Sequence, residues 1–371
     1  MKVCVDIQAA IAQRAGVGRY TRMLAEHLGA LAGADTLSFF YFDFCRKGAP
    51  FPVANAEQRA FRWCPGRLAQ SAWNTIAWPP FDWFAGDADV YHFPNFLLPP
   101  LRRGKAVVTV HDASFLRFPD MAEERNRRHL TARIHETVAR ADAVITDSAF
   151  SARELESLLA VKREKVFPVY PGIGRELVRP DAESIAATRR ALGLNRPYLL
   201  TVGTLEPRKN IPFLIDVFES LTSFQGDLVV AGMTGWKYEP ILGRMRRSTR
   251  AAEIRYLNYV PDGQLPGLYA GAEAFVFPSL YEGFGFPPLE AMACETPVVS
   301  STGGSLPEVL GDAALRLNAF EVEPWAQAIS GVLSDTAARR DLVARGRQRA
   351  ARYTWEEAAR ATWEIYRKVG R

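Results

Sequence analysis

Short apolar runs alternate with longer amphipathic stretches along nearly the whole chain. The apolar runs are rich in β-branched residues, which is typical of buried strands, whereas stretches such as residues 19–31 and 211–221 place apolar residues at helical spacing. Strands that alternate with helices favour βαβ units and parallel sheets. The predicted strands are 2–7, 37–42, 89–93, 106–112, 143–148, 165–172, 198–203, 227–232, 254–260, 274–280, 297–301 and 314–318.

One stretch rich in glycine, proline and polar residues, 169–184, separates this strand series into two halves. We therefore place a domain boundary near residue 175 and predict an α/β fold of two Rossmann-like domains, with ligands at the carboxyl ends of their strands. The predicted divisions are residues 1–175, 176–352 and 353–371. The last division carries aromatic residues at helical spacing, so we expect a terminal helix that packs across the domain junction.

Charge and cysteine content narrow the class of protein. The chain has 371 residues and a formal net charge of +5. This mild basic excess suits an anionic substrate or a membrane surface and is too small to indicate nucleic acid. Four scattered cysteines without CxxC spacing predict a reduced, cytoplasmic compartment. The chain has no apolar run of about 18 residues and no apolar start, so we expect neither a membrane span nor a signal peptide.

The richest candidate chemistry is in "PSLYEGFGFPPLEAMA", residues 278–293, where a predicted strand passes through a loop into a helix. Glu282 lies in the loop and Glu290 about one turn into the helix, so the two carboxylates can bind different hydroxyls of one sugar nucleotide. Gly285 lets a ligand approach the backbone, and Pro287 suits the first helical turn, where an anion is favoured. An isolated EGxG is more often a plain glycine turn; its surroundings favour a binding site here.

Two further predicted strand ends carry candidate groups. "TVGTLEPRKN" places Arg208 and Lys209 after a strand, and this pair matches phosphate oxygens. The alternative is a solvated basic pair. "AVVTVHDASF" places His111 after another strand, where its side chain or backbone can bind a sugar hydroxyl, or where it is a structural histidine.

Glycine pairs and acidic pairs elsewhere are weaker signals. Gly16 and Gly18 precede the first long helix, but a lone GxG also suits a tight turn, and without GxGxxG spacing an NAD site is disfavoured. The glycine pair in residues 302–312 lines a phosphate pocket or is a simple loop. Asp87 and Asp89 have the DxD spacing of metal-dependent sugar transferases, but Asp89 opens a predicted strand rather than closing one, so we expect no metal site.

Together these motifs resemble a known family. "EGFGFPPLE", from Glu282 to Glu290, resembles the E-x7-E motif of family-4 retaining glycosyltransferases, which have the GT-B fold of two Rossmann-like domains facing across a cleft. The resemblance spans nearly the whole chain and favours the bacterial branch that builds cell-surface polysaccharide such as O-antigen. One departure is Glu295, where the family usually has glycine. The other matching stretches are "VGTLEPRKN", "VHDASFLRFPD", "TDSAFSARELES", "GWKYE" and "SLPEVLGDAA".

The resemblance implies roles for residues of the second domain. Arg208 and Lys209 would neutralise the diphosphate of the donor, and Glu290 would hold the ribose hydroxyls. Glu282, with the backbone of Gly285 and Phe286, would bind the donor sugar at the start of the helix that contains Pro287. Val260 would flank the base.

In the first domain, the resemblance implies that His111 contacts the sugar near the anomeric centre. Gly16 and Gly18 would let their loop approach the diphosphate and the acceptor. The implied reaction moves a hexose, with mannose from GDP-mannose as our best prediction, onto a growing glycan or a lipid-linked saccharide. It retains the anomeric configuration and needs no metal and no cofactor.

Alternatives remain open from the sequence. A UDP-sugar donor, a sugar-nucleotide epimerase and a non-catalytic sugar-nucleotide-binding protein are all compatible with parts of the pattern. Residues 95–105 and 123–140 also combine leucines with arginines. They predict either a peripheral membrane surface, at the inner face of the membrane, or core leucines beside solvated arginines.

Overall fold

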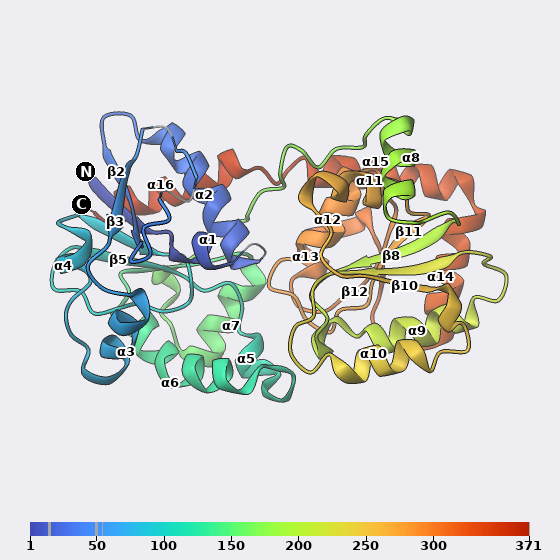
Figure 1. Ribbon diagram of the computed structural model, residues 1–371, viewed down its shortest axis with the longest axis horizontal. Helices are drawn as coiled ribbons and strands as arrows, with labels where there is room; N and C mark the ends of the chain where they lie inside the picture. Colours follow the sequence, from blue (N-terminus) through green and yellow to red (C-terminus); the bar gives the residue numbers. More distant parts are fainter. Residues whose placement is uncertain (14–15, 49–50, 54, 371) are drawn as a thin grey trace. The chain divides into compact units, whose positions relative to one another are not determined.

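The computed structural model describes residues 1–13, 16–48, 51–53 and 55–370. The chain divides into two compact units (Figure 1). Unit 1 consists of Met1–Leu116, Arg125–Gly172 and the chain from Thr354 on, and unit 2 consists of Arg117–Glu124 and Ile173–Tyr353. Both units are parallel α/β domains, as the strand pattern predicts.

The units differ from the predicted divisions in two places. The terminal helix belongs to unit 1 rather than forming a separate division, and residues 117–124, which the sequence places in the first domain, pack with unit 2. This segment is held by unit 2 because the ring of Phe118 lies 5.6 Å from that of Tyr281 and the indole N–H of Trp236 donates to the Met121 carbonyl at 2.5 Å.

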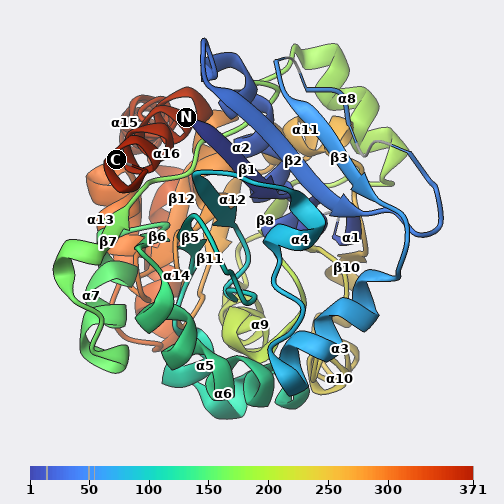
Figure 2. The ribbon, with the colours of Figure 1, turned by 90° about the vertical axis from the view of Figure 1, so that its left-hand side faces the viewer.

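Unit 1 contains a seven-stranded parallel sheet in the order β3-β2-β1-β4-β5-β6-β7. The neighbouring ribbons of β1, β2 and β3 can be followed in Figure 2. Of these strands, the sequence missed β3, because this short edge strand is half-buried, begins with three polar residues and lacks an apolar run. The strands are β1 Lys2–Asp6, β2 Thr36–Phe42, β3 Glu57–Phe61, β4 Val90–Phe93, β5 Lys105–Thr109, β6 Ala143–Thr146 and β7 Val166–Pro168.

Helices lie on both faces of this sheet, with α2 and α16 on one face and α6 and α7 on the other (Figure 1). The α-helices of unit 1 are α1 Gln8–Ala12, α2 Val17–Leu31, α3 Gly66–Ile76, α4 Asp82–Ala85, α6 Glu124–Arg140, α7 Ala149–Leu159 and α16 Trp355–Val369, with α5 Ser114–Arg117 and the 3₁₀ turn η2 Arg163–Lys165 between them. The 3₁₀ turn η1 Pro119–Met121 lies in the segment that packs with unit 2. In α6, Leu130, Ile134 and Val138 are buried, so this face is core and is not a membrane surface.

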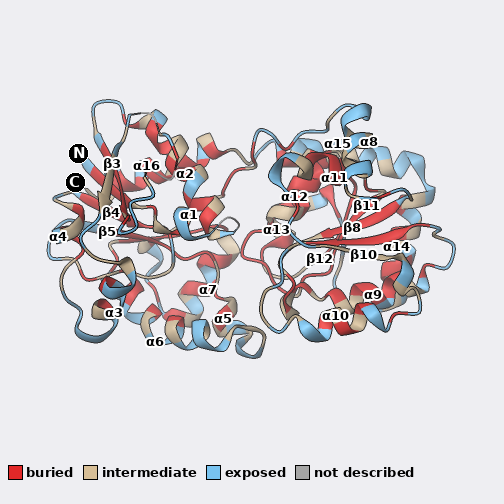
Figure 3. Ribbon diagram, in the orientation of Figure 1, coloured by how far each residue is buried: buried red, intermediate tan, exposed pale blue. Residues whose placement is uncertain are grey.

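Unit 2 contains a six-stranded parallel sheet in the order β10-β9-β8-β11-β12-β13. Its central strands are buried along their length (Figure 3), which explains why they read as continuous apolar runs. The strands are β8 Tyr198–Val202, β9 Asp227–Ala231, β10 Ile254–Leu257, β11 Ala274–Phe277, β12 Val298–Ser301 and β13 Leu315–Leu317.

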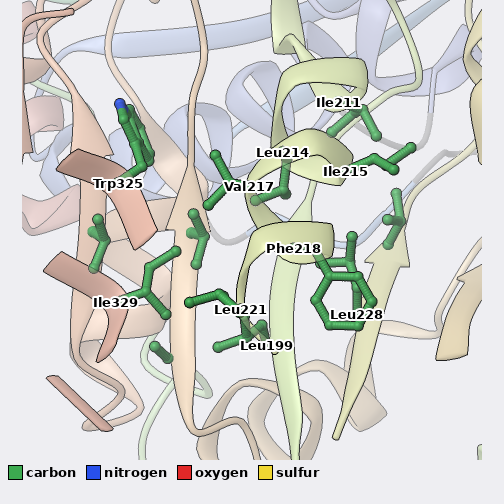
Figure 4. Close-up of a cluster of buried hydrophobic side chains, with 14 of the residues drawn as sticks. Leu199, Ile211, Leu214, Ile215, Val217, Phe218, Leu221, Leu228, Trp325 and Ile329 are labelled. Atoms are coloured by element: carbon green, nitrogen blue, oxygen red, sulfur yellow. The ribbon is translucent and has the colours of Figure 1, made fainter. Parts of the chain in front are cut away.

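Much of the core of unit 2 lies between this sheet and helices α9 and α14. Leu214, Phe218 and Ile329 are fully buried there, beside the indole of Trp325 (Figure 4). The helices of unit 2 are α8 Ala182–Ala191, α9 Ile211–Ser220, α10 Glu239–Arg246, α11 Leu265–Ala270, α12 Phe286–Ala293, α13 Leu306–Leu310, α14 Val322–Ser334 and α15 Thr336–Ala350, with the 3₁₀ turns η3 Pro207–Lys209, η4 Ala251–Glu253, η5 Asp262–Gln264 and η6 Gly311–Ala313.

Candidate active site

The strand order reverses beside β8 in unit 2: β9 and β10 follow on one side, and β11 to β13 on the other. Ligands of open parallel sheets bind at such a switch point, beyond the carboxyl ends of the strands. Arg208 and Lys209 follow β8 in the turn η3, and Glu282 follows β11, the neighbour of β8. The topology thus brings together residues that lie 73 positions apart in the sequence.

The three side chains form a buried ion cluster. Glu282 Oε1 lies 2.6 Å from Lys209 Nζ, and its Oε2 lies 2.9 Å from Arg208 Nη1. The Arg208 guanidinium also donates to the Tyr281 carbonyl at 2.5 Å. Each cation is therefore held in place by a carboxylate from the adjacent strand end.

Two members of this cluster were missed from the sequence. Glu206 Oε1 lies 2.6 Å from Arg208 Nη2, and the Ser279 hydroxyl donates to Glu282 Oε1 at 2.5 Å. Both lie inside the stretches that the sequence singled out: Glu206 shortly after the predicted strand 198–203, and Ser279 at the end of the predicted strand 274–280. With Glu206 included, two carboxylates balance two cations.

The charges also set the ionisation of Glu282. Burial raises its pKa, but the charges of Arg208 and Lys209, with the hydrogen bonds from Lys209 and Ser279, outweigh that cost and hold the pKa at about 2. Glu282 is therefore a carboxylate at any physiological pH, and it is an acceptor rather than a proton donor.

A glycine loop supports the backbone of Glu282. Residues 302–305, between β12 and α13, lie against it: a Cβ on Gly304 would lie 2.3 Å from the Glu282 carbonyl oxygen, and the Ser305 N–H donates to that oxygen at 2.9 Å. Gly304 also has a positive φ of 66°, which glycine adopts without strain. These contacts show that the glycine loop braces the Glu282 turn.

Helix α12 begins at Phe286, after Gly285, whose φ is 103°. A Cβ on Gly285 would lie 2.7 Å from Leu306 Cδ2, so this position requires glycine for both space and conformation. Pro287 and Pro288 fill the second and third helical positions and have no N–H, which leaves the first turn with fewer donors for an anion than the sequence interpretation assumed.

Glu290 lies within α12 and is buried. Its Oε2 accepts a hydrogen bond from the Tyr269 hydroxyl at 2.7 Å. Tyr269 lies on α11, and the sequence did not suggest it as a partner. Val260 follows β10 and is also buried.

In unit 1, the candidates lie at the carboxyl ends of β1 and β5. His111 is buried beyond β5, with Nδ1 at 2.8 Å from Asp147 Oδ2 and Nε2 at 3.0 Å from the Pro94 carbonyl. Asp147 follows β6, so the rule that selected His111 would have selected it too.

The glycine pair at the start of α2 has two separate roles. Gly16 is the N-cap and has φ 57° and ψ −125°, with open space where a Cβ would lie. Gly18 is buried, and a Cβ there would lie 2.0 Å from the Gln13 carbonyl oxygen. Gly18 thus serves packing, whereas a Cβ at Gly16 would meet no described atom within 4 Å.

Asp89 lies just before β4 and accepts the Lys2 N–H at 2.6 Å, so it sits at the amino end of the sheet, away from the site. Within residues 1–13, 16–48, 51–53 and 55–370, no group of three or more His, Cys, Asp or Glu side chains is placed to hold a metal ion. In the same ranges, no helix is long and apolar enough to cross a membrane.

The chain matches two glycosyltransferase families in succession: "Glycosyltransferase Family 4" over residues 14–177 and "Glycosyl transferases group 1" over residues 185–349. It is 36% identical to the O-antigen chain mannosyltransferase B of Escherichia coli over 282 residues, which cover 75% of this chain and 74% of that protein.

Solved structures share the fold at low sequence identity. Sucrose-phosphate synthase from Thermosynechococcus elongatus aligns with a TM-score of 0.77 at 20% identity, covering 100% of this chain and 99% of that one. HepE from Anabaena in complex with UDP and glucose aligns with a TM-score of 0.73 at 18% identity, covering 100% and 99%. With its two parallel-sheet units and its ion cluster at the switch point of the second, the chain belongs to the family-4 and group-1 glycosyltransferases of the GT-B fold.

Proposed function

We propose that the protein is a retaining hexosyltransferase that moves mannose from GDP-mannose onto a growing cell-surface glycan or a lipid-linked acceptor. The observation that carries this proposal is the cluster of Arg208, Lys209 and Glu282 at the switch point of unit 2. The choice of mannose rests on the similarity to an O-antigen mannosyltransferase.

In the proposed reaction, Arg208 and Lys209 bind the diphosphate of the donor, the leaving group. Glu282 forms an ion pair with each of the two cations and so orients them. Its carboxylate can also accept a hydrogen bond from a sugar hydroxyl. Glu290, which is held by a hydrogen bond from Tyr269, accepts hydrogen bonds from the ribose hydroxyls in this proposal. Two fixed cations supply the charge that a metal would otherwise supply, so catalysis consists mainly of positioning and charge stabilisation.

Two substitutions test the cluster. Arg208→Ala and Lys209→Ala should each lower turnover by on the order of 100-fold, because a charge-assisted contact to the leaving phosphate strengthens in the transition state. The measurement is mannose transfer from GDP-mannose to a lipid-linked or glycan acceptor. Wild-type rates in both variants would contradict the assignment. The control is Arg244→Ala, which removes a cation of unit 2 that pairs with Glu219 away from the switch point.

The donor is tested separately. Nucleotide sugars that bind the folded state raise the melting temperature, so GDP-mannose should stabilise the protein more than UDP-glucose at equal concentration. The reverse order would favour a UDP-sugar donor, of the kind suggested by the HepE complex with UDP and glucose. Activity that persists in EDTA would agree with a metal-free reaction. Complete loss of activity in EDTA would favour a metal-binding role for Asp87 and Asp89.

The same assay separates the rival functions. An epimerase converts the donor without an acceptor, and a non-catalytic binding protein is stabilised by the donor but turns over nothing. A transferase releases GDP only when the acceptor is present. Turnover of GDP-mannose to another GDP-hexose in the absence of acceptor would replace our proposal by the epimerase.

We also propose that unit 1 binds the inner surface of the membrane peripherally, from the cytoplasm. Several exposed apolar side chains lie elsewhere than the sequence suggested, on or next in sequence to α3 and α4, which can be followed in Figure 2. The Arg102 guanidinium lies 6.0 Å from the Trp83 ring, and Arg133 donates to Asn74 at 2.6 Å, so cations border the patch. Exposed tryptophans beside cations suit an anionic lipid surface. The patch is Trp63, Leu68, Ile76, Trp78 and Trp83.

Flotation with liposomes tests this surface. The protein should float with anionic liposomes at low salt and less so at high salt, because electrostatic attraction is screened. Replacing Trp63, Trp78 and Trp83 by serine should abolish flotation. The matched control replaces three exposed apolar residues of unit 2, Val178, Met233 and Tyr259, by serine and should still float. Equal flotation of the two triple variants would reject the patch.

A further inference from the structure

The ring of His111 lies between two oxygen atoms in unit 1. Its Nδ1 faces Asp147 Oδ2 at 2.8 Å, and its Nε2 faces the Pro94 carbonyl oxygen at 3.0 Å. Both partners are hydrogen-bond acceptors. The ring is almost fully buried, so water cannot take the place of either partner.

A neutral imidazole has one donor nitrogen and one acceptor nitrogen. With a carboxylate on one side and a carbonyl on the other, either neutral tautomer would turn a lone pair of the ring toward an oxygen lone pair. An imidazolium donates from both nitrogens and satisfies both oxygens. The hydrogen-bond geometry alone therefore favours the charged ring.

We infer that Asp147 holds His111 as a buried imidazolium and is thereby a positioning residue for the transfer reaction. The second part of this inference rests on the proposed function. Because both N–H groups are committed to internal acceptors, His111 has no lone pair with which to accept a proton from an acceptor hydroxyl. Its contribution is a fixed positive charge and a fixed backbone, whose carbonyl accepts the Ser151 hydroxyl at 3.2 Å.

In the transfer step, one bond to the anomeric carbon forms as another breaks. The bond between the sugar's anomeric carbon and the acceptor oxygen forms, and the bond between that carbon and the phosphate oxygen breaks, with its electron pair leaving on the nucleoside diphosphate. The acceptor proton then passes to the departing phosphate oxygen. No protein base at His111 takes part.

The surroundings of the ring agree with a cation. The rings of Tyr20 and Phe96 pack against it, with centroids at 4.7 and 5.4 Å, and exclude water. Asp147 Oδ1 is buried and has no hydrogen-bond partner within the described ranges, so the charge of this carboxylate is compensated chiefly by His111. The titratable groups that face His111 are Asp147 after β6, Asp112 in its own loop, Tyr20 on α2 and His92 on β4, which is linked to Tyr366 on α16.

The two buried histidines of unit 1, His111 and His92, thus differ in charge: the first ring is positively charged and the second is neutral. Burial lowers the pKa of His111, but the charge and hydrogen bond of Asp147 outweigh this, and the pKa is raised above its ordinary value. For His92, burial and the neighbouring charge of His111 lower the pKa to about 3. The His92 ring bonds to the hydroxyls of Tyr366 and Thr109, which can donate to a neutral ring or accept from it.

The charge state is measured directly by nitrogen-15 NMR of the full chain labelled at histidine. The His111 signal should show two protonated ring nitrogens at neutral pH and should titrate above the ordinary range of histidine. It is assigned by its absence in His111→Gln. If His111→Gln does not fold, His27, His129 and His135 are replaced one at a time instead. The His111 signal is then the doubly protonated signal that persists in all three variants. A neutral His111 at pH 7 would overturn the inference.

The positioning role is measured with Asp147→Asn, which keeps the shape of the side chain but removes the charge that holds the proton. The kcat of this variant should fall by about tenfold or more at neutral pH and recover partly as the pH is lowered toward about 6, where the ring regains its proton. Its KM for the donor should stay unchanged. The control is Asp142→Asn at the other end of β6, where the carboxylate pairs with exposed Lys105 at 3.1 Å.

A loss in Asp147→Asn that does not depend on pH would mean a merely structural role and would overturn the positioning role. This outcome differs from a failure of the proposed function, in which the wild type transfers no sugar under any condition. The NMR measurement stands in either case, because it requires no turnover.

Discussion

Glu295 is the residue at which this chain departs from the family pattern, which usually has glycine there. The structure explains the pattern: Glu295 follows the last turn of α12 with a φ of 61°, the left-handed conformation that favours glycine at the end of a helix. Its carboxylate lies 3.5 Å from Arg347, whose side chain is 71% exposed, so this ion pair offsets little of the backbone strain.

Replacing Glu295 by glycine should therefore stabilise unit 2. We expect a gain of roughly 0.5–1 kcal/mol in the free energy of unfolding, since relief of the left-handed strain exceeds the added entropy of glycine in the unfolded chain. Urea unfolding measures it. The control is Glu295→Ala, which removes the same ion pair but keeps the strain and should give no gain. Equal stabilisation by alanine would show that charge, and not conformation, is the cause.

At the scale of elements, the ends of β8 and β11 are joined by the ion cluster around Glu282. Removing one charge of a buried pair leaves its partners uncompensated in a medium that solvates them poorly. Glu282→Gln would remove the carboxylate that pairs with both Lys209 and Arg208, and would leave the pair of Arg208 with Glu206 in place.

We expect Glu282→Gln to lower the free energy of unfolding by about 3 kcal/mol at neutral pH. The pH dependence has a defined sign. The pKa of Glu282 is about 2 in the folded protein and has its ordinary, higher value in the unfolded chain. Its stabilisation is therefore complete above the unfolded pKa and is lost as the pH falls toward 2. Urea titrations from pH 7 to 3 should show the gap between wild type and variant closing.

The matched control is Glu253→Gln, which breaks surface ion pairs with Arg250 and Arg196 in the same unit. Its carboxylate is partly exposed, so we expect a cost of about 1 kcal/mol or less. A similar cost for both variants would mean that the cluster at the switch point contributes no more than an ordinary surface pair.

The same elements show how far the sequence alone can predict the fold. Strands such as β8 and β11 are buried on both faces and read as apolar runs, whereas β3, "EQRAF" at the sheet edge, has no such run and was missed. Position after a strand end selected Arg208, Lys209 and Glu282, and the structure brings these three together because parallel strands share one carboxyl edge. Their pairing was not predictable, since it depends on the strand order that makes β8 and β11 neighbours.

At the scale of the whole molecule, the chain changes units at places that no local pattern marks. Residues 117–124 leave unit 1 and pack with unit 2, and the chain returns to unit 1 at Thr354 after completing unit 2. Helical spacing predicted α16 itself. The assignment of α16 to unit 1 depends on contacts with residues more than 200 positions away, such as the hydrogen bond between Tyr366 and His92, with a separation of 274.

Two tyrosines 13 positions apart in the sequence, 353 and 366, therefore stabilise different units. The Tyr366 hydroxyl lies 2.6 Å from His92 Nδ1 in the buried interior of unit 1. The Tyr353 hydroxyl donates to the Val309 carbonyl at 3.0 Å in unit 2, where its ring packs against Phe284.

Tyr366→Phe should lower the stability of unit 1 by about 1–3 kcal/mol, because it leaves a buried ring nitrogen without its partner. Hydrogen exchange should show faster exchange of the amides of β4 and β5, with those of β8 and β11 unchanged. Tyr353→Phe makes the same chemical change and should speed exchange in α13 of unit 2 while leaving β4 and β5 protected. If Tyr366→Phe loosened the strands of unit 2 as much as those of unit 1, the terminal helix would belong to both units, as the sequence first suggested.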